Sequence, residues 1–478
     1  MINRRQNTQY SGIWWLPAAP DYAPRLHGIL RYTPNEGFEL EVIGSFFDIS
    51  EILPNAKNPA IIQGISSDGK NITLYKCFSS HVSIGSHSIG NQGIQISRYK
   101  PSIVFMGAHF DKEPMFNKLI INYSYLDEWV NISGFDIPAP STKGEYLIKY
   151  KLPEDINITL DENYDLTITH SVQGPNLNMV QKESRITQTT HIMIGSKIEI
   201  PISQYHEIIN MIKNFLSFGV DRPVYPLSIC GKSEEHISFY KNIKIYDDIY
   251  IYYNKKEIPD DFEPIIPTNM FFVFKDIAES FELFIRNWLN QSIVLSPVFD
   301  LYFSNVYTPK MYSETRFLNA VQAIESYHRR KDTTKKFVKS IEEHDERMIK
   351  IISFAPLEYM NWLLEKLRYS NEVYLALRLK EILTLHKDIA EIYIGNKKQQ
   401  DDFVYRVVAT RNYLTHFDVD NEEKCAKGTD LLILIEKLKL IIKSCLLEEI
   451  GMDQSRIRTI LENYKPRSFL AWDFVSWD

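Results

Sequence analysis

Two hydrophobic patterns divide this chain, and their boundary constrains the fold more than any single motif. Before about residue 200, apolar residues fall in short runs rich in β-branched and aromatic side chains, each bounded by Gly, Pro, Asn or Asp. The runs at 25–33 and 37–46 are joined through the turn signal "PNEG", which predicts a hairpin. Many such runs predict an antiparallel sandwich or partly closed barrel up to about Ile200.

Beyond this region the pattern becomes helical. Residues 202–219 read as a helix and residues 236–254 as strands, so 201–304 is predicted to be a smaller α+β extension of the N-terminal module. From about Tyr307 only helical stripes remain, which predicts an all-α bundle over 305–478. A length of 478 residues also favours more than one domain. The predicted fold is multidomain α+β, with a β-rich, sandwich-like N-terminal domain at 1–200.

The overall charge excludes one class of function. A formal net charge of −7 and a pI near 6.0 are unlike those of proteins that coat nucleic acids, which are basic overall. An enzyme needs only a local basic patch, so these values are compatible with an RNA substrate.

The cysteines and the apolar runs indicate where in the cell the protein is located. Four cysteines without a CxxC pair predict neither a zinc ribbon nor a disulfide framework: Cys77, Cys230, Cys425 and Cys445. The longest apolar run, "LLILIEKLKLIIKSCLL", is interrupted by charged residues, so it predicts an amphipathic helix and not a membrane span. The N-terminus lacks the apolar run of a secretory signal. We therefore expect a cytoplasmic protein with no metal or other cofactor.

The motif "RNYLTH" stands on a stretch that otherwise reads as buried helix. It brings together Arg411, Asn412 and His416, of which the last two share one helical face. Arginine offers a planar, charged fork for phosphate oxygens, and histidine can take or give a proton near neutral pH. Because RNA carries its own 2′-hydroxyl nucleophile, such groups can suffice for cleavage without a metal. The alternative is a helix end that turns toward water.

The surroundings of this motif resemble a known family. An arginine, a polar residue, a short spacer and a histidine on a helix of an all-α bundle resemble the HEPN superfamily of helical ribonucleases. The segment "FLNAVQAIESYHRR", the downstream "RNYLTHF" and the N-terminal "GIWWLP…RLHGILRY" are together similar to ApeA-type HEPN proteins. The resemblance covers essentially the whole chain, and the C-terminal motif is its specific part.

This resemblance implies a metal-independent endoribonuclease of bacterial antiphage defence. By analogy, two HEPN domains pair, and each contributes Arg411 and His416 to a shared cleft. His416 is then a general acid or base, Arg411 binds the scissile phosphate, and Asn412 orients the substrate or His416. The product is a 2′,3′-cyclic phosphate.

Two further residues are candidates for an accessory role. Glu325 and His328 lie one turn apart on the first helix of the predicted bundle. Glu325 either points into the cleft and holds Arg411 or His416, or forms an ordinary ion pair, for instance with Arg329. His328 is expected to be a partly exposed helix residue.

Other features favour structural interpretations. The basic run from His328 to Lys336 can contact an RNA backbone, but a solvated helix end is the favoured interpretation. His81 and His87 share a strand face without a third metal ligand. Trp14 is expected in a packed edge of the N-terminal module and not in a binding platform.

The function implied by the family resemblance also predicts the binding partners. We expect RNA as the substrate, and transfer RNA in particular. We expect a phage protein as the trigger that the N-terminal module recognises. The protein is expected to form a homodimer or larger homo-oligomer and not to bind a membrane. The helix at 431–447 and the aromatic tail at 466–478 are expected to supply the apolar surface for pairing. The alternatives are a non-catalytic recognition protein whose helices only dimerise, and a HEPN domain that binds RNA or nucleotide without cleaving it.

Overall fold

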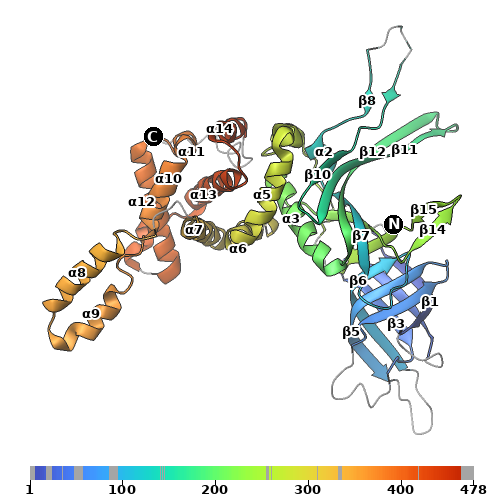
Figure 1. Cartoon of the computed structure of the whole chain (residues 1–478), viewed down its shortest axis with the longest axis horizontal. Coiled ribbons are helices and arrows are strands. Elements are labelled where there is room, and N and C mark those ends of the chain that lie inside the picture. Colours follow the sequence, from blue (N-terminus) through green and yellow to red (C-terminus); the bar gives the residue numbers. More distant parts are fainter. Residues whose placement is uncertain are drawn as a thin grey trace. The chain divides into compact units, whose positions relative to one another are not determined.

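A computed structural model gives the fold as two compact units, each considered by itself (Figure 1). It describes residues 6–17, 24–34, 36–47, 58–84, 95–139, 142, 144, 146–254, 258–259, 261–308, 310–331, 336–417 and 419–464. The β unit comprises Met1–Leu216, Val224–Thr268 and Val273–Asp276. The helical unit comprises Ser217–Pro223, Asn269–Phe272 and Ile277–Asp478.

A six-stranded antiparallel barrel opens the β unit. Its strands are β1 (Thr8–Trp15), β2 (Leu26–Thr33), β3 (Gly37–Ile43), β4 (Ile61–Ser66), β5 (Asn71–Ile84) and β6 (Gln95–Met106). Neighbours follow the order β6–β3–β2–β1–β4–β5, and β5 pairs again with β6, so the barrel closes. The predicted hairpin of β2 and β3 is confirmed, with Thr33 opposite Gly37 at its turn.

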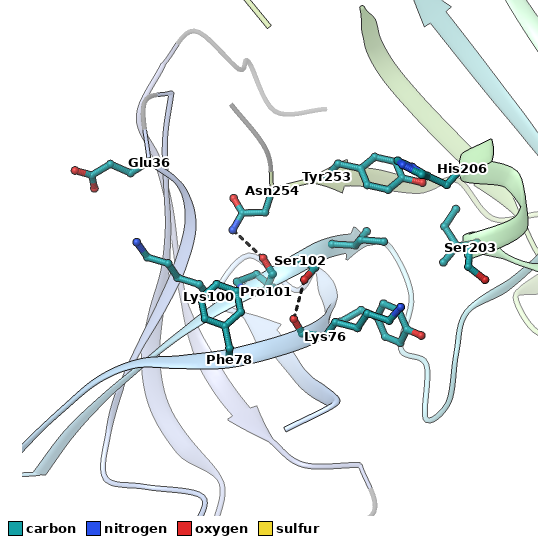
Figure 2. Close-up of a pocket in the computed structure, with 13 residues that line it drawn as sticks. Glu36, Lys76, Phe78, Lys100, Pro101, Ser102, Ser203, His206, Tyr253 and Asn254 are labelled. Carbon is teal, nitrogen blue, oxygen red and sulfur yellow. Dashed lines mark hydrogen bonds between the residues drawn. The ribbon is translucent and has the colours of Figure 1, made fainter. Parts of the chain in front are cut away.

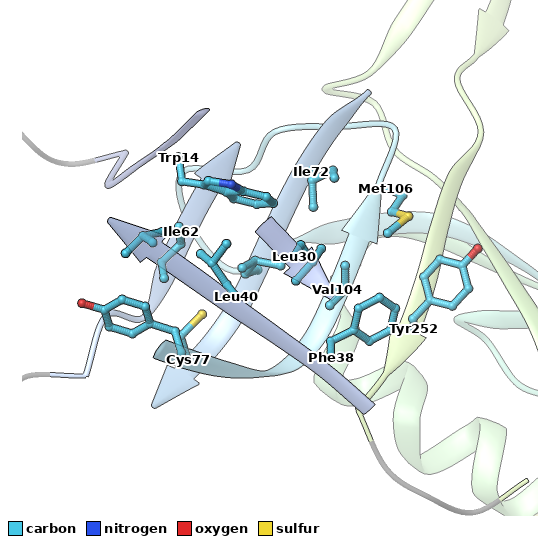
Figure 3. Close-up of a cluster of buried hydrophobic side chains, with 13 residues drawn as sticks. Trp14, Leu30, Phe38, Leu40, Ile62, Ile72, Cys77, Val104, Met106 and Tyr252 are labelled. Atoms are coloured by element: carbon cyan, nitrogen blue, oxygen red, sulfur yellow. The ribbon is translucent and has the colours of Figure 1, made fainter. Parts of the chain in front are cut away.

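The barrel encloses an apolar core (Figure 3). Trp14 lies fully buried in it with Leu30, Leu40 and Ile72, which confirms the prediction that this tryptophan is a packing residue. A Cβ atom on Gly64 would lie 2.2 Å from the Trp14 ring, so only glycine leaves the indole enough room. Phe38, Leu40 and Val42 are alternate residues of β3 in this core, as the period of two in a strand requires.

An open antiparallel sheet continues from β6. Its strands follow the order β6–β16–β13–β7–β12–β11–β10: β7 (Met115–Tyr123), β10 (Ile156–Thr159), β11 (Tyr164–Asn178), β12 (Glu183–Pro201), β13 (Pro226–Lys232) and β16 (Ile249–Tyr253). Two small hairpins accompany it: β8 (Phe135–Asp136) with β9 (Lys149–Tyr150), and β14 (Ile237–Tyr240) with β15 (Ile243–Tyr246). Helix α2 (Leu126–Val130) and helix α3 (Ile202–Val220) complete the unit, although the last turn of α3 belongs to the helical unit.

The helical unit contains the predicted bundle. Its main helices are α5 (Phe281–Val294), α6 (Ser296–Tyr307), α7 (Ser313–Arg330), α8 (Ile341–Ser353), α9 (Met360–Leu367), α10 (Leu375–Leu385), α11 (Lys387–Tyr393), α12 (Lys397–His416), α13 (Gly428–Glu449) and α14 (Gln454–Asn463). A β-rich N-terminal part and a helical C-terminal part confirm the predicted fold class. Within the segment 201–304, α5 and most of α6 are grouped with the helical unit, while β13 and β16 belong to the β unit.

Helix α13 is the central helix of this unit and not a free apolar face. Leu438, Leu447 and eleven further residues of α13 are buried. The expectation that this helix supplies an apolar surface for dimerisation is therefore wrong, because the surface is used inside its own unit. The tail at 466–478 lies outside the described residues.

A buried ionic cluster joins α13 to a distant segment of the chain. The Asp221 carboxylate lies 2.8 Å from the ammonium nitrogens of both Lys439 and Lys443. Burial lowers the pKa of Lys443 to about 7, although Asp221 opposes that shift. The Lys443 ammonium also lies 3.8 Å from the centre of the Phe271 ring. Residues near 221 and 271 are thus needed to complete the core of the helical unit.

Within the described part of the chain, we find no helix whose length and apolar composition would let it cross a bilayer.

Candidate active site

The RNYLTH motif forms the C-terminal end of α12. The helix begins at a capping box in which Asn396 and Gln399 bond each other's backbone N–H groups. Its buried face carries Phe403 and Val407, and this face anchors it in the bundle. The helix ends where Phe417 adopts a left-handed φ of 50°. The motif therefore lies where the buried helix reaches the surface.

Arg411 is held on two sides. One Nη atom donates a hydrogen bond to the Asn412 amide oxygen at 3.2 Å, and the other lies 3.6 Å from a Glu325 carboxylate oxygen. The Arg411 side chain remains 34% exposed, so part of its guanidinium fork can be reached from solvent. The interpretation of Glu325 that pairs it with Arg411 agrees with this contact, whereas Arg329 pairs with Glu372 at 3.3 Å.

His416 is exposed at the last position of α12. Among the described residues it takes no part in the contacts that join Arg411, Asn412 and Glu325. The end of α12 therefore exposes an imidazole and part of a guanidinium, the residue types that phosphodiester chemistry uses.

His328 has a different environment from the one expected. It is fully buried, its Nε2 lies 2.9 Å from a Glu381 oxygen, and its Nδ1 lies 3.0 Å from an Arg378 Nη atom. Because arginine can only donate, Nδ1 accepts and Nε2–H donates to the carboxylate, which defines the neutral tautomer. Burial lowers the pKa of His328. The expectation of a partly exposed helix residue is wrong, and this side chain faces α10 inside the bundle.

Where it is described, the basic run beyond His328 makes contacts within the helical unit. Arg330 donates a hydrogen bond to the Val294 carbonyl oxygen, and Lys336 donates to backbone carbonyl oxygens of the run itself. Lys331 lies 2.7 Å from Glu448 and 2.9 Å from Glu449, and Arg329 pairs with Glu372. These contacts agree with the structural interpretation of the run, while residues 332–335 lie outside the described part. The same holds for His87 and for the side chain of His81. Among the residues that are described, none form a group of three side chains suited to hold a metal ion.

A second concave site lies in the β unit, where the sequence predicts none (Figure 2). The cavity has a volume of about 460 Å³ and lies among β5, β6, β16 and the start of α3. Lys76 and Lys100 extend toward opposite ends of it, and the rings of Phe78 and Tyr253 line it between them. Such a volume is typical of ligand pockets. Its residues come from distant segments of the chain, so no local motif announces it.

Two features of this cavity indicate an unfilled binding capacity. The Tyr253 hydroxyl is buried and has no hydrogen-bond partner within the described residues. Burial raises the pKa of Tyr253, so the hydroxyl is a donor at neutral pH. Lys76 adopts a left-handed φ of 52°, and strained non-glycine positions of this kind cluster at ligand sites.

The structure defines a two-part protein, with a β unit that contains a closed barrel and an open sheet and a helical unit that presents an arginine and a histidine at one helix end. Comparison with family models identifies the family. A model described as ApeA N-terminal domain 1 matches residues 9–288, and one described as Apea-like HEPN matches residues 318–456. The chain belongs to the ApeA-type HEPN family, which confirms the resemblance found in the sequence.

Membership in this family indicates a nuclease-type function in antiphage defence, because HEPN domains are generally ribonucleases. No curated protein and no solved structure matches the chain significantly.

Proposed function

We propose that the protein is a metal-independent endoribonuclease that cleaves RNA by attack of the 2′-hydroxyl on the adjacent phosphorus. The observation that carries this proposal is the exposed end of α12, where Glu325 and Asn412 hold Arg411 five residues before an accessible His416. RNA supplies the nucleophile, so the protein needs to move protons and stabilise charge.

In the proposed reaction, an imidazole removes the proton of the 2′-hydroxyl as the O–P bond forms. The guanidinium of Arg411 binds the phosphate oxygens as negative charge develops on them. A second imidazole gives a proton to the 5′-oxygen as its bond to phosphorus breaks. The products are a 2′,3′-cyclic phosphate and a free 5′-hydroxyl.

This division of roles supports a symmetric homodimer. One chain offers one Arg411 and one His416, whereas the reaction uses an acid, a base and charge stabilisation. A two-fold axis beside α12 doubles these groups, and isologous pairing is the commonest arrangement of identical chains.

The experiment is incubation of the full-length protein with total RNA in EDTA, with His416→Ala as the matched control. Wild-type protein should cleave and leave cyclic-phosphate ends, and the variant should not. RNA carrying a 2′-O-methyl group at the cut site should resist, since its nucleophile is blocked. A requirement for Mg²⁺, or cleavage of the methylated bond, would refute the proposal. Sequencing of the fragments tests transfer RNA as the substrate.

We further propose that the β unit regulates this activity by binding a phage protein. The cavity with Lys76, Phe78, Lys100 and Tyr253 supports a recognition role. Cells that carry a Lys76→Glu/Phe78→Ala variant should lose defence against phage, while the purified variant keeps the cleavage rate of the resting enzyme. Unchanged defence would exclude this cavity as the receptor surface.

The non-catalytic alternative predicts a different outcome of the same assays. A recognition protein whose helices only dimerise has no need of Arg411 or His416. Its defence activity should therefore survive His416→Ala, which the ribonuclease proposal forbids.

A further inference from the structure

Helices α8 and α9 form an arm that projects from the other helices of the helical unit (Figure 1). We name Ile341–Leu367 the arm; it is inserted between α7 and α10. Neither helix of the arm contains a buried residue. All the other helices of more than ten residues in the described part of this unit bury an apolar face. The arm is therefore the exception to the packing of its own domain.

The arm has one half-buried face and one exposed face. The two helices meet through side chains that are only partly covered: His344, Met348, Ile352, Met360, Leu363 and Leu367. Beyond this seam, Phe354 is 89% exposed, Leu357 86% and Trp362 58%. Helices as short as these are marginal in water without packing partners. A projecting element that carries large exposed apolar side chains is typical of an interaction site.

The charges of α8 indicate which partner fits. Its first half carries four carboxylates, Glu342, Glu343, Asp345 and Glu346, and its second half carries Arg347 and Lys350. Two copies of α8 that run antiparallel place the acidic half of each against the basic half of the other. The acidic half would repel an RNA backbone. A helix polarised in this way is complementary to itself under two-fold symmetry.

The exposed area is also of the right size. Phe, Tyr and Trp side chains each cover about 150–250 Å² when buried. The three exposed aromatic residues of the arm alone then offer on the order of 400 Å² per copy, about half of the ~800 Å² per partner of stable protein pairs, and exposed aliphatic residues add to this area. The exposed apolar residues of the arm are Ile341, Ile349, Ile351, Phe354, Leu357, Tyr359, Trp362 and Leu364.

We infer that the arm pairs with the same arm of a second copy of this chain, antiparallel about a two-fold axis. The pairing does not depend on nuclease activity, although it would supply the dimer that the proposed function needs. The arm follows α7 in the chain, and α7 carries Glu325, the residue that holds Arg411.

The first experiment measures the mass of the full-length protein by sedimentation equilibrium. Wild-type protein should be dimeric, and Phe354→Glu/Leu357→Glu should weaken association at least tenfold with unchanged circular dichroism. The control is Phe239→Glu/Ile243→Glu, which adds the same two charges at residues of β14 and β15 that are 69% and 65% exposed, and it should behave as wild type. A monomeric wild type, or a dimer that the arm variant does not weaken, overturns the inference.

The second experiment tests the antiparallel charge pattern. Glu342→Lys/Glu346→Lys makes α8 basic, and Arg347→Glu/Lys350→Glu makes it acidic, so each variant should fail to pair with itself. An equimolar mixture of the two should form dimers again. Absence of rescue overturns the antiparallel arrangement. Dimers that depend on the arm but do not cleave RNA would leave this inference intact while the proposed function fails.

Discussion

The helical unit contains two sets of arginine, histidine and glutamate side chains, and the two sets differ in burial. Arg378, His328 and Glu381 meet between α10 and α7, where the arginine and the histidine are buried. Arg411 and His416 lie at the end of α12, where Arg411 pairs with Glu325 and both can be reached from solvent. The same residue types thus form a structural network in one place and a candidate active site in the other.

The difference teaches that accessibility and not residue type separates the two roles. In the buried set, each polar group already has a partner and the histidine is held in one tautomer, so no group remains for a substrate. In the exposed set, the arginine is oriented by neighbours while its fork stays partly open. Substitutions in the two sets should therefore affect different quantities.

The largest effect on activity is expected for His416→Ala. Loss of a proton-transfer group typically lowers a rate by about 10²–10⁴-fold. The free energy of unfolding should stay within about 0.5 kcal/mol of wild type, since exposed residues contribute little to folding. Single-turnover cleavage and urea denaturation measure the two quantities. A stable variant that cleaves at the wild-type rate would remove His416 from the chemistry.

The second-largest effect on activity is expected for Arg411→Lys, which should lower the cleavage rate more than about tenfold. Lysine keeps the charge but loses the planar fork that grips two phosphate oxygens. The expected signature is a lower kcat in a protein that still binds RNA, measured by filter binding and single-turnover kinetics. Full activity would mean that charge alone suffices at this position.

Arg378→Met should act on stability instead. It leaves the Nδ1 atom of His328 without its donor inside the bundle, which costs about 2–3 kcal/mol of unfolding free energy. Arg329→Met is the matched control, because its exposed pair with Glu372 is worth less than about 1 kcal/mol. Urea denaturation compares them, and equal losses would contradict the special role of the buried pair.

The pH dependence of the unfolding free energy should report on the buried set through His328. Burial lowers the pKa of His328 in the folded state, relative to about 6.5 in the unfolded chain. Its contribution is therefore fully present above about pH 6.5 and is lost as the pH falls toward the folded-state pKa. His328→Gln should lose less stability than wild type between pH 7.5 and 5.5. Equal slopes for wild type and His328→Gln would contradict this prediction.

The smallest effect is expected for Glu325→Gln. Its pair with Arg411 is 3.6 Å long and partly exposed, so its loss should cost less than about 1 kcal/mol of stability. The cleavage rate should fall by less than about tenfold, because Glu325 orients Arg411 and need not touch the substrate. A loss as large as that of His416→Ala would instead place Glu325 in the chemistry.

Much of the fold follows from periodicity. The alternation of β2 and β3 and the turn between them predict the hairpin, and the stripe of Phe317, Val321 and Ile324 predicts the buried face of α7. The burial of His328 was also encoded, because it continues that stripe at the next heptad position. The expectation that His328 is partly exposed was wrong because it relied on histidine being a polar residue and not on its position in the apolar stripe.

Other features could not be predicted from the sequence. The amphipathic pattern of α8 is the same whether its apolar face packs inside its own domain or against another molecule. Periodicity therefore could not tell the exposed arm from the buried α13. The cavity beside Tyr253 is assembled from β5, β6, α3 and β16, which only the tertiary fold brings together. Glu325 and Arg411 are separated by 86 residues of chain. From the sequence, Glu325 could contact either the RNYLTH motif or a nearby residue such as Arg329, and only the positions of α7 and α12 in the fold show the contact with Arg411.

The ionic cluster of Asp221, Lys439 and Lys443 has a consequence for the modular history of this protein. A gene fragment that begins at residue 305 would encode the RNYLTH motif but lack Asp221, leaving two buried lysines without their carboxylate. An uncompensated buried charge costs several kcal/mol, comparable to the whole stability of a domain. Recombination at a single point between the two halves would therefore yield unstable chimeras. The β unit and the helical unit are therefore expected to be inherited together.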